Sequence, residues 1–323
     1  MKKNVGYCCF TDVANIGDYA LYNANKILFP ELNILNANNP ELDSNINIFG
    51  GGTLYPYSLY ANKFKPRKFE FAIGQGVNPP LNEKFSIPTR FRMRYRKFNY
   101  FGVRGFHSQK ILNDHGIKSI VTGDSALAFA GSVKANLNSN IIGINLVTQK
   151  MGDRIGNDDL IFNKVKGLIN EALSNGHEIL LIPCCISDVD GMKELCKISN
   201  KVRFLDFWSA PINMDLDAFF TEIATCSFVI TERLHASVFC SLIGVPFLSI
   251  NYKPKCMDFI DTLKLDRDIS VDPDKFVRDI KYTDIVEFIN NLSISEQLQD
   301  STLNLRRSLW DAASEISDMI DNI

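Results

Sequence analysis

The segment Phe228–Lys255, FVITERLHASVFCSLIGVPFLSINYKPK, decides the fold. Residues 228–231 form a short apolar run with β-branched members, which predicts a buried strand. Residues 236–243 are apolar over a helical length and are followed by Gly244, which predicts a helix that ends there. Residues 247–251 predict a second buried strand. A strand, a helix and a strand with tight joints make a βαβ unit, so the two strands should be parallel neighbours.

Polar side chains follow both predicted strands of this unit. Glu232, Arg233 and His235 stand between the first strand and the helix. Lys255 comes shortly after the second strand. Both places lie at the carboxyl edge of the sheet, where open α/β sheets bind ligands. Arg233, Lys255 and the free amides of the helix start predict an anion site, and His235 adds a group that moves protons near neutral pH.

The composition is that of an ordinary soluble globular chain. The chain has 323 residues, enough for about two domains, with 46% apolar and 22% charged residues. A net charge of −2 gives no support for nucleic acid as a partner. No apolar run is long enough to span a membrane, and Asp12 interrupts the N-terminal apolar run, so no signal peptide is predicted. We expect a cytoplasmic protein.

The cysteine pattern favours reduced thiols. The adjacent pairs Cys8–Cys9 and Cys184–Cys185 fall inside predicted strands, where neighbours point to opposite faces. Neither pair is therefore predicted to chelate a metal, and no metal site is expected.

The first half of the chain places three further polar or glycine-rich segments at strand ends. Asp18 precedes a helix predicted from Tyr19 and is either its N-cap or a general base for an acceptor hydroxyl. Gly50–Gly52, before Thr53, make either a tight turn or a close backbone approach to a ligand. Arg104 ends an apolar run and is the second arginine predicted in the site, and Asp124 is predicted to cap the following turn.

The polar segment 130–140 is a plausible linker, and the second half again alternates strands and helices. We therefore predict domains at 1–135 and 136–323. The expected fold is two Rossmann-like α/β domains facing each other across a cleft, as in the glycosyltransferase-B architecture. The last helix, from about Ser293, is expected to pack back on the first domain.

Five motifs in order resemble the polysaccharide pyruvyl transferase family. They are NIGDYAL (15–21), GGGTLY (50–55), GVRG (102–105), GDSAL (123–127), and TERLHA followed by GVPFLSINYKPK (231–255). The resemblance implies an enzyme that uses phosphoenolpyruvate to place a pyruvate ketal on a sugar, releasing phosphate. The sugar belongs to a surface polysaccharide such as an exopolysaccharide or capsule, or to its lipid-linked precursor.

The resemblance and the chemistry of the reaction together assign roles. His235 and Asp18 are the predicted catalytic residues. Phosphoenolpyruvate, the co-substrate, is expected to bind the second domain, and no metal or other cofactor is expected. The predicted phosphoenolpyruvate ligands are Arg104, Arg233, Leu234 and Lys255. The residues predicted to line the acceptor side are Asn15, Gly17, Gly51, Gly52 and Thr53.

Two basic clusters bear on the acceptor. They comprise Lys63, Lys65, Arg67 and Lys68, and then Arg90, Arg92, Arg94, Arg96 and Lys97. One interpretation is a solvated surface helix. The other is peripheral contact with the anionic inner face of a membrane, which suits a lipid-diphosphate-linked glycan.

Two other function classes stay open. A nucleotide-sugar glycosyltransferase of the same architecture often carries two glutamates separated by seven residues. Here Glu232 stands at one such position, but Cys240 occupies the other, which counts against this class. A non-catalytic glycan-binding relative is the second alternative. The presence together of all the charged members of the predicted site argues against it; they are Arg104, Arg233, His235 and Lys255.

Overall fold

The computed structural model describes residues 2–11, 14–55, 64–77, 87, 89–129, 131, 133–148, 155–208, 215–265 and 268–323. Lys63 of the first basic cluster and the side chain of Arg90 in the second lie outside the described part.

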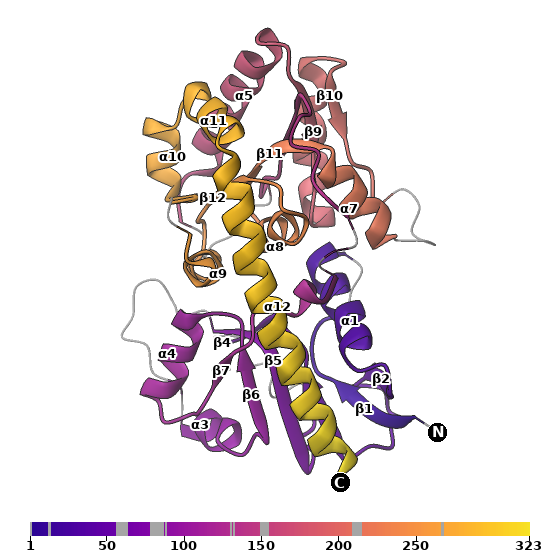
Figure 1. Ribbon diagram of the computed structural model, residues 1–323. Helices are drawn as coiled ribbons and strands as arrows, with labels where there is room; N and C mark the ends of the chain where they lie inside the picture. The colour runs from indigo at the N-terminus through magenta and orange to yellow at the C-terminus, as the bar shows by residue number, and fades with distance from the viewer. Residues whose placement is uncertain are drawn as a thin grey trace. The chain divides into compact units, whose positions relative to one another are not determined.

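The chain forms two compact units (Figure 1). Unit 1 comprises Met1–Val13, Asp18–Phe129 and Leu303–Ile323, and unit 2 comprises Ala14–Gly17 and Ala130–Thr302. The main division therefore falls between Phe129 and Ala130 and not at residue 135, and two further segments depart from a single boundary. The short segment Ala14–Gly17 belongs to unit 2, and the end of the chain belongs to unit 1.

Unit 1 is built on a parallel sheet of strand order β2-β1-β3-β5-β6-β7, with β4 paired to β5 off this path. Its strands are β1 (Lys3–Tyr7), β2 (Leu32–Asn36), β3 (Ile46–Phe49), β4 (Thr53–Tyr55), β5 (Phe69–Val77), β6 (Tyr100–Val103) and β7 (Ile120–Val121). β3 and β5 are buried along almost their whole length, as expected for strands that helices cover on both faces.

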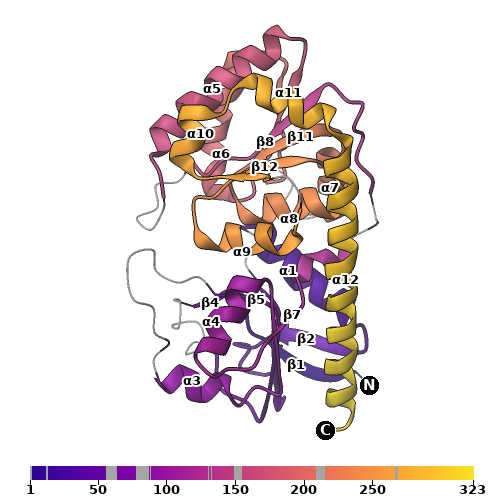
Figure 2. The ribbon, with the colours of Figure 1, turned by 60° about the vertical axis from the view of Figure 1, so that its left-hand side comes forward.

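Helices cover both faces of this sheet. They are α1 (Ile16–Leu28), α3 (Thr89–Tyr95), α4 (Phe106–Asp114) and the short 3₁₀ helix η1 (Ser125–Phe129). Figure 2 shows α3 and α4 on one side of the sheet and the second half of the last helix on the other. The division between the units passes through α1, between Gly17 and Asp18.

Unit 2 contains a second parallel sheet, of order β10-β9-β8-β11-β12-β13. Its strands are β8 (Ile141–Ile144), β9 (Glu178–Leu181), β10 (Val202–Phe204), β11 (Cys226–Thr231), β12 (Phe247–Ile250) and β13 (Ser270–Val271). Its helical segments are α5 (Asp158–Ser174), η2 (Ile186–Asp188), α6 (Val189–Lys193), η3 (Glu194–Ile198), α7 (Leu216–Ala224), α8 (Leu234–Ile243), α9 (Pro254–Leu263), α10 (Pro273–Asp279) and α11 (Tyr282–Asn290). The two-sheet α/β fold predicted from the sequence is confirmed.

The βαβ unit that decides the fold forms as predicted. β11 and β12 are parallel neighbours, with Val229 opposite Phe247 and Thr231 opposite Ser249. α8 joins them and ends at Gly244, whose φ of 84° is the left-handed conformation that glycine adopts most readily. Every residue of both strands is buried, which explains why the two segments lack the alternating pattern of a half-exposed strand.

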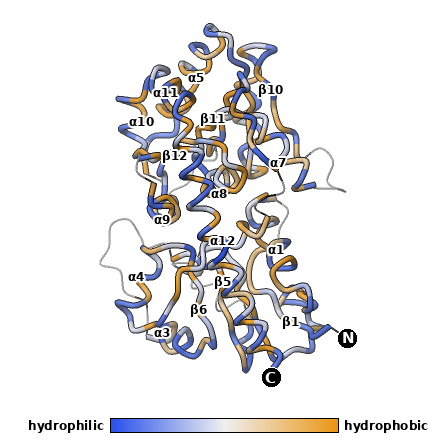
Figure 3. The backbone as a smooth tube through the Cα atoms, in the orientation of Figure 1, coloured by the Kyte–Doolittle hydropathy of each residue, from blue (hydrophilic) through white to orange (hydrophobic). Residues whose placement is uncertain are grey.

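The last helix, α12 (Leu292–Asp321), contributes its second half to unit 1. Lys3 at the start of β1 donates a hydrogen bond from Nζ to the carbonyl of Ile320 at 2.7 Å. Leu309 and Ile316 are fully buried. Figure 3 shows apolar and polar positions recurring along α12, the pattern of a helix with one buried face. The predicted packing of the last helix on the first domain is confirmed.

Two local predictions are wrong. The first helix begins at Ile16, not at Tyr19. The adjacent cysteines lie beyond the ends of β1 and β9, which stop at Tyr7 and Leu181. The apolar segments continue into the core beyond the last hydrogen-bonded pair of the sheet. An apolar sequence indicates that a segment is buried, but it does not show where strand pairing ends.

No helix in the described part of the chain is long and apolar enough to cross a membrane.

Candidate active site

The carboxyl ends of three neighbouring strands of unit 2 are tied together by one buried amide. Asn145, just after β8, accepts hydrogen bonds at Oδ1 from the backbone N–H of Arg233, at 2.8 Å, and of Glu232, at 3.3 Å. Its Nδ2 donates to the carbonyl of Ile182, just after β9, at 2.8 Å. This network fixes the turn between β11 and α8, which carries two of the predicted phosphoenolpyruvate ligands, Arg233 and Leu234.

Glu232 is part of this buried framework. Its Oε2 accepts a hydrogen bond from the backbone N–H of Val147 at 2.7 Å, and only 1% of its surface is exposed. Cys240, the position that a second glutamate occupies in many glycosyltransferases, is buried inside α8. Glu232 therefore anchors the segment after β8 to the turn after β11.

Arg233 occupies the N-cap position of α8 and forms a buried ion pair with Asp188. Asp188 accepts hydrogen bonds from Nη2, at 2.7 Å, and from Nε. Burial alone would lower the pKa of the guanidinium, but the hydrogen bonds and charge of Asp188 outweigh it and raise the pKa above the usual 12.5. Thr148 secures the carboxylate by donating its backbone N–H to Oδ1 at 3.3 Å. Arg233 is therefore charged and held in one orientation.

Two lysines and a buried tyrosine follow β12. The Lys253 and Lys255 ammonium groups lie 5.7 and 5.9 Å from the ring centre of Tyr252, within the range of a cation–π interaction. Tyr252 is 1% exposed, and its pKa is raised, first by burial, while the charge of Arg233 partly opposes the shift. The structure thus places Tyr252 within the electrostatic reach of Arg233 and close to Lys255.

His235 is the second residue of α8 and is half-buried. Its ring stacks with that of Phe239, one turn later, with centroids 6.1 Å apart. Leu234, predicted as a phosphoenolpyruvate ligand, is the first helical residue and is 2% exposed. Its side chain belongs to the core, so any contact of Leu234 with a ligand has to come from its backbone.

The segment Ala14–Gly17 packs beside this turn within unit 2. Asn15 occupies the N-cap position of α1, because its Oδ1 accepts the backbone N–H of Gly17 at 2.9 Å. Asn15 also forms an antiparallel bridge with Cys185. The cap interpretation of Asp18 is therefore wrong: Asp18 is the third residue of the helix, where a carboxylate still favours the positive helix end.

Asp18 belongs to unit 1 and lies near the carboxyl end of β1. Burial raises the pKa of the Cys9 thiol to about 12, and the negative charge of Asp18 is the next largest cause. Asp18 also contributes to the raised pKa of Tyr7. Its carboxylate is thus at the edge of the sheet where a ligand of unit 1 would bind.

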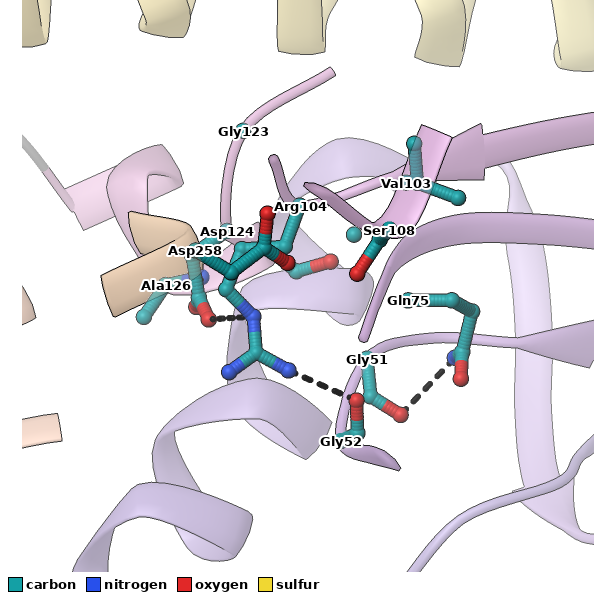
Figure 4. A network of polar contacts seen from close by, with 12 residues as sticks. Gly51, Gly52, Gln75, Val103, Arg104, Ser108, Gly123, Asp124, Ala126 and Asp258 are labelled. Atoms are coloured by element: carbon teal, nitrogen blue, oxygen red, sulfur yellow. Dashed lines mark hydrogen bonds and ion pairs between the residues drawn. The ribbon is translucent and has the colours of Figure 1, made fainter. Parts of the chain in front are cut away.

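Arg104, the second predicted arginine, is buried in unit 1 and is 1% exposed, and Figure 4 shows its guanidinium beside Asp124 and Gly52. Its Nε lies 3.2 Å from Oδ2 of Asp124, and its Nη2 donates to the carbonyl of Gly52 at 2.7 Å. Asp124 also caps η1, accepting the N–H of Ala126 at Oδ1 at 3.0 Å, which confirms the predicted cap. Arg104 therefore connects three loops at the carboxyl edge.

The glycine-rich segment after β3 is a tight turn with internal partners. Gly51 and Gly52 have φ angles of 118° and 82°, which side chains other than glycine rarely adopt. The Gly51 carbonyl accepts from Gln75 Nε2 at 2.8 Å, as Figure 4 shows, and the Gly52 carbonyl accepts from the N–H of Gly76 at 2.8 Å. Thr53, the first residue of β4, lies opposite Gly76.

The two basic clusters are partly engaged in internal contacts. Arg67 donates from Nε to Oδ1 of Asn47 at 3.1 Å, and Arg94 pairs with Glu70 at 2.6 Å. Arg96 donates from Nε to the carbonyl of Gly116 at 3.0 Å. These arginines fasten loops of unit 1, and Lys65, Lys68 and Lys97 are exposed.

Asp188 and Asn145 were missed by the sequence analysis. Each follows a strand of the second sheet, which is a signal that could have marked them. No local sequence pattern predicts that Asp188 pairs with Arg233, because the two residues are 45 positions apart. Among the described residues, no group of three or more His, Cys, Asp or Glu is placed to hold a metal ion.

Solved structures of similar fold extend over the whole chain. They include a UDP complex of MnaA from S. aureus, with a TM-score of 0.58 and 12% identity over 99% of this chain and 96% of that one. A glycosyltransferase from Rickettsia africae gives 0.55 and 13% over 99% and 98%. HepE from Anabaena, in complex with UDP and glucose, gives 0.52 and 10% over 100% of both. At these identities the likeness shows a glycosyltransferase-B-like fold and no more.

The family is shown by a different comparison. No curated protein matches the chain in sequence. The model of the family described as polysaccharide pyruvyl transferase matches residues 15–254, well over half of the chain. This range contains Asn15, Asp18, Arg104, Arg233 and His235. The chain therefore belongs to the polysaccharide pyruvyl transferase family, and it is an enzyme.

Proposed function

We propose that the protein transfers the enolpyruvyl group of phosphoenolpyruvate to two hydroxyls of one sugar, forming a pyruvate ketal. The sugar belongs to a surface polysaccharide, such as an exopolysaccharide or capsule, or to its lipid-linked precursor. The two hydroxyls lose their protons, the methylene carbon of the enol gains one, and phosphate leaves with the other. The reaction balances with phosphoenolpyruvate as co-substrate and without a further cofactor.

The arrangement at the turn after β11 carries this proposal. Arg233 and His235 are two residues apart at the start of α8. The ammonium group of Lys255 lies within cation–π range of the Tyr252 ring, and the charge of Arg233 opposes the rise in the pKa of Tyr252. Two cations beside the positive end of a helix suit a small anion that has both a phosphate and a carboxylate. Asp188 engages Nε and Nη2 of Arg233, so we assign Nη1 to the phosphate.

His235 is assigned the proton transfer to and from the enol. A general acid or base of this kind accelerates a reaction by about 10²- to 10⁴-fold. Asp18 is assigned as the base for an acceptor hydroxyl. Arg104 is assigned to the charged part of phosphoenolpyruvate. Unit 2 is the proposed phosphoenolpyruvate side, and unit 1, with its Gly51–Thr53 turn, is the proposed acceptor side. Asn15 and Gly17, which are also proposed to contact the acceptor, belong to unit 2.

The acceptor is proposed to be a lipid-diphosphate-linked glycan at the cytoplasmic face of the inner membrane. The exposed lysines Lys65, Lys68 and Lys97 support peripheral contact with an anionic surface, to which each basic residue can contribute about 1 kcal/mol. Because Arg67, Arg94 and Arg96 hold loops of unit 1, the lysines are the residues to test.

The decisive test measures phosphate release from phosphoenolpyruvate with a panel of free and lipid-linked glycans. His235→Ala should lower kcat by at least 10²-fold, and Arg233→Ala should raise the KM for phosphoenolpyruvate. Lys110→Ala, which removes an exposed cation paired with Asp114, is the control and should act as wild type. Unchanged turnover in both site variants would refute the assignment of the site.

The alternative is a nucleotide-sugar-dependent glycosyltransferase, which the fold likeness also accommodates. That class often uses a pair of glutamates. Here Glu232 is buried and its carboxylate accepts the Val147 amide, and Cys240 stands at the position of the second glutamate. The chain therefore lacks this pair. Thermal shift assays separate the two, because a ligand that binds the folded state raises Tm. Protection by UDP-sugars and not by phosphoenolpyruvate would favour the alternative. A non-catalytic glycan-binding protein would give glycan protection without any phosphate release.

A further inference from the structure

Gly17 lies directly against the imidazole of His235. A Cβ atom added to Gly17 would be 2.6 Å from Cε1 of His235 and nearer still to Nδ1 and Cγ, so no side chain fits there without displacing the ring. Both residues belong to unit 2. We propose that Gly17 is a positioning residue, whose bare Cα sets where the His235 ring stands. This inference rests on the proposed function, in which His235 transfers the proton.

The conformation of Gly17 does not require glycine. Its φ is not among the positive values of the chain, and it is the second residue of helix α1. Alanine is the better helix former, because glycine loses more backbone freedom on folding. A glycine at this place is therefore explained by the space that the imidazole occupies and not by the backbone.

The backbone around Gly17 is fixed and cannot retreat from an added side chain. The N–H of Ile16 donates to the carbonyl of Cys184 at 3.0 Å, and the carbonyl of Ala14 accepts the N–H of Ile186 at 2.9 Å. Asn15 Oδ1 accepts the N–H of Gly17 itself at 2.9 Å. Ala14 and Ile16 thus attach the segment to the loop that follows β9, and the bond between Asn15 and Gly17 holds the segment itself.

Another neighbour of the ring comes from its own helix. Phe239 stacks with His235 at an interplanar angle of 26°. The imidazole is therefore bounded by Phe239 on α8 and by Gly17 on its Nδ1 edge. A methyl group at residue 17 would push the ring away from this edge and out of its present alignment with the aromatic ring.

The experiment compares Gly17→Ala with Gly167→Ala, a glycine in α5 where an added Cβ meets nothing within 4 Å. With phosphoenolpyruvate and the accepting glycan, Gly17→Ala should lower kcat about 100-fold, the loss that a displacement of about 1 Å can cause. The KM for phosphoenolpyruvate should change less than twofold, because Arg233 and Lys255 stay in place. Gly167→Ala should act as wild type. The proposal would be overturned if Gly17→Ala kept the kcat of the wild type. It would also be overturned if the loss of kcat/KM came from a higher KM and not from a lower kcat.

A second measurement does not depend on activity. The chain has four histidines, so the His235 ring signals can be assigned in a ¹H–¹³C NMR spectrum by comparison with His235→Ala. Gly17→Ala should shift the His235 signals and leave those of His107, His115 and His177 in place. Unshifted His235 signals overturn the positioning role, whereas absent phosphate release by the wild type overturns only the proposed function. If Gly17→Ala fails to fold, the double variant with His235→Ala must recover the fold, and failure to recover also overturns the proposal.

Discussion

Asp188 and Arg233 form an ion pair in which both carboxylate oxygens accept hydrogen bonds from the guanidinium, with Nη2 at 2.7 Å from Oδ1. Asp188 is fully buried and Arg233 is 8% exposed. The carboxylate comes from the loop after β9 and the guanidinium from the turn after β11. The planar fork of arginine matches a carboxylate at two points, so this pair fixes orientation as well as charge. The proposed phosphate ligand is therefore aligned before any substrate binds.

Asp188→Asn should be strongly destabilising. The change leaves the Arg233 charge buried and uncompensated, and loss of one partner of a buried pair costs about 3–5 kcal/mol. Urea unfolding followed by circular dichroism measures the loss. Asp114→Asn, which breaks an exposed pair with Lys110, is the control and should leave the midpoint unchanged. Equal midpoints for Asp188→Asn and wild type would show that the pair contributes nothing to stability.

The pair of Asp124 with Arg104 should give a pH-dependent term in the stability of unit 1. Burial raises the pKa of Asp124 above the usual 3.8, although Arg104 opposes the shift. The folded state therefore binds this proton more tightly than the unfolded state does. Stability contributed by Asp124 is complete below pH 3.8 and declines as the pH rises towards the folded-state pKa.

This sign can be measured with Asp124→Asn, which cannot titrate. The free energy of unfolding is measured for wild type and variant at intervals from pH 3.5 to 7. As the pH rises, the difference between the two should shift in favour of the variant, because only the wild type loses the contribution of Asp124. A pH-independent offset from the changed side chain does not affect this slope. A difference that stays flat, or moves the other way, would contradict the raised pKa.

Local patterns predicted the sheet of unit 2 better than the contacts within the site. The segment Phe228–Lys255 carries its own strand, helix and glycine stop, so the sequence alone defines β11, α8 and β12. The roles of Asn145 and Asp188 arise only when strands distant in sequence become neighbours in the sheet. Hydrogen bonds of this kind have no local signature.

The start of α1 shows where a local rule is ambiguous. Both Asn15 and Asp18 are good N-cap residues, and both precede an apolar helical pattern. The hydrogen bond from the Gly17 N–H selects Asn15. That choice brings Gly17 into the first helical turn and against His235, which could not be predicted without the pairing of Asn15 with Cys185.

The second half of α12 should contribute substantially to the stability of unit 1. Ile316 is fully buried there, whereas Leu303, on the same helix, is 42% exposed. Ile316→Ala removes buried methyl groups and leaves a cavity, so it should cost about 2–5 kcal/mol. Leu303→Ala, as the matched control, should change the free energy of unfolding by less than about 0.5 kcal/mol. Similar losses in both variants would mean that α12 packs on this sheet differently.

The buried cysteines should resist alkylation in the folded protein although all eight are free thiols. Burial raises the pKa of Cys226 to about 12 and also raises that of Cys184 and Cys240. A pKa of about 12 leaves roughly one thiolate in ten thousand at pH 8, and the thiolate is the form that reacts. Iodoacetamide at pH 8 should therefore modify the half-buried Cys185 and Cys196 before the buried Cys226.

Mass spectrometry of the labelled peptides measures the order of modification. In urea all eight cysteines should be labelled, which controls for intrinsic reactivity. Raising the pH to 10 increases the thiolate fraction of Cys226 about a hundredfold but leaves its thiol inaccessible in the core, so the folded protein should still protect it. Labelling of Cys226 as fast as Cys185 in the folded protein would show that unit 2 opens readily around β11, and the rigid alignment of Arg233 beside that strand would then be untenable.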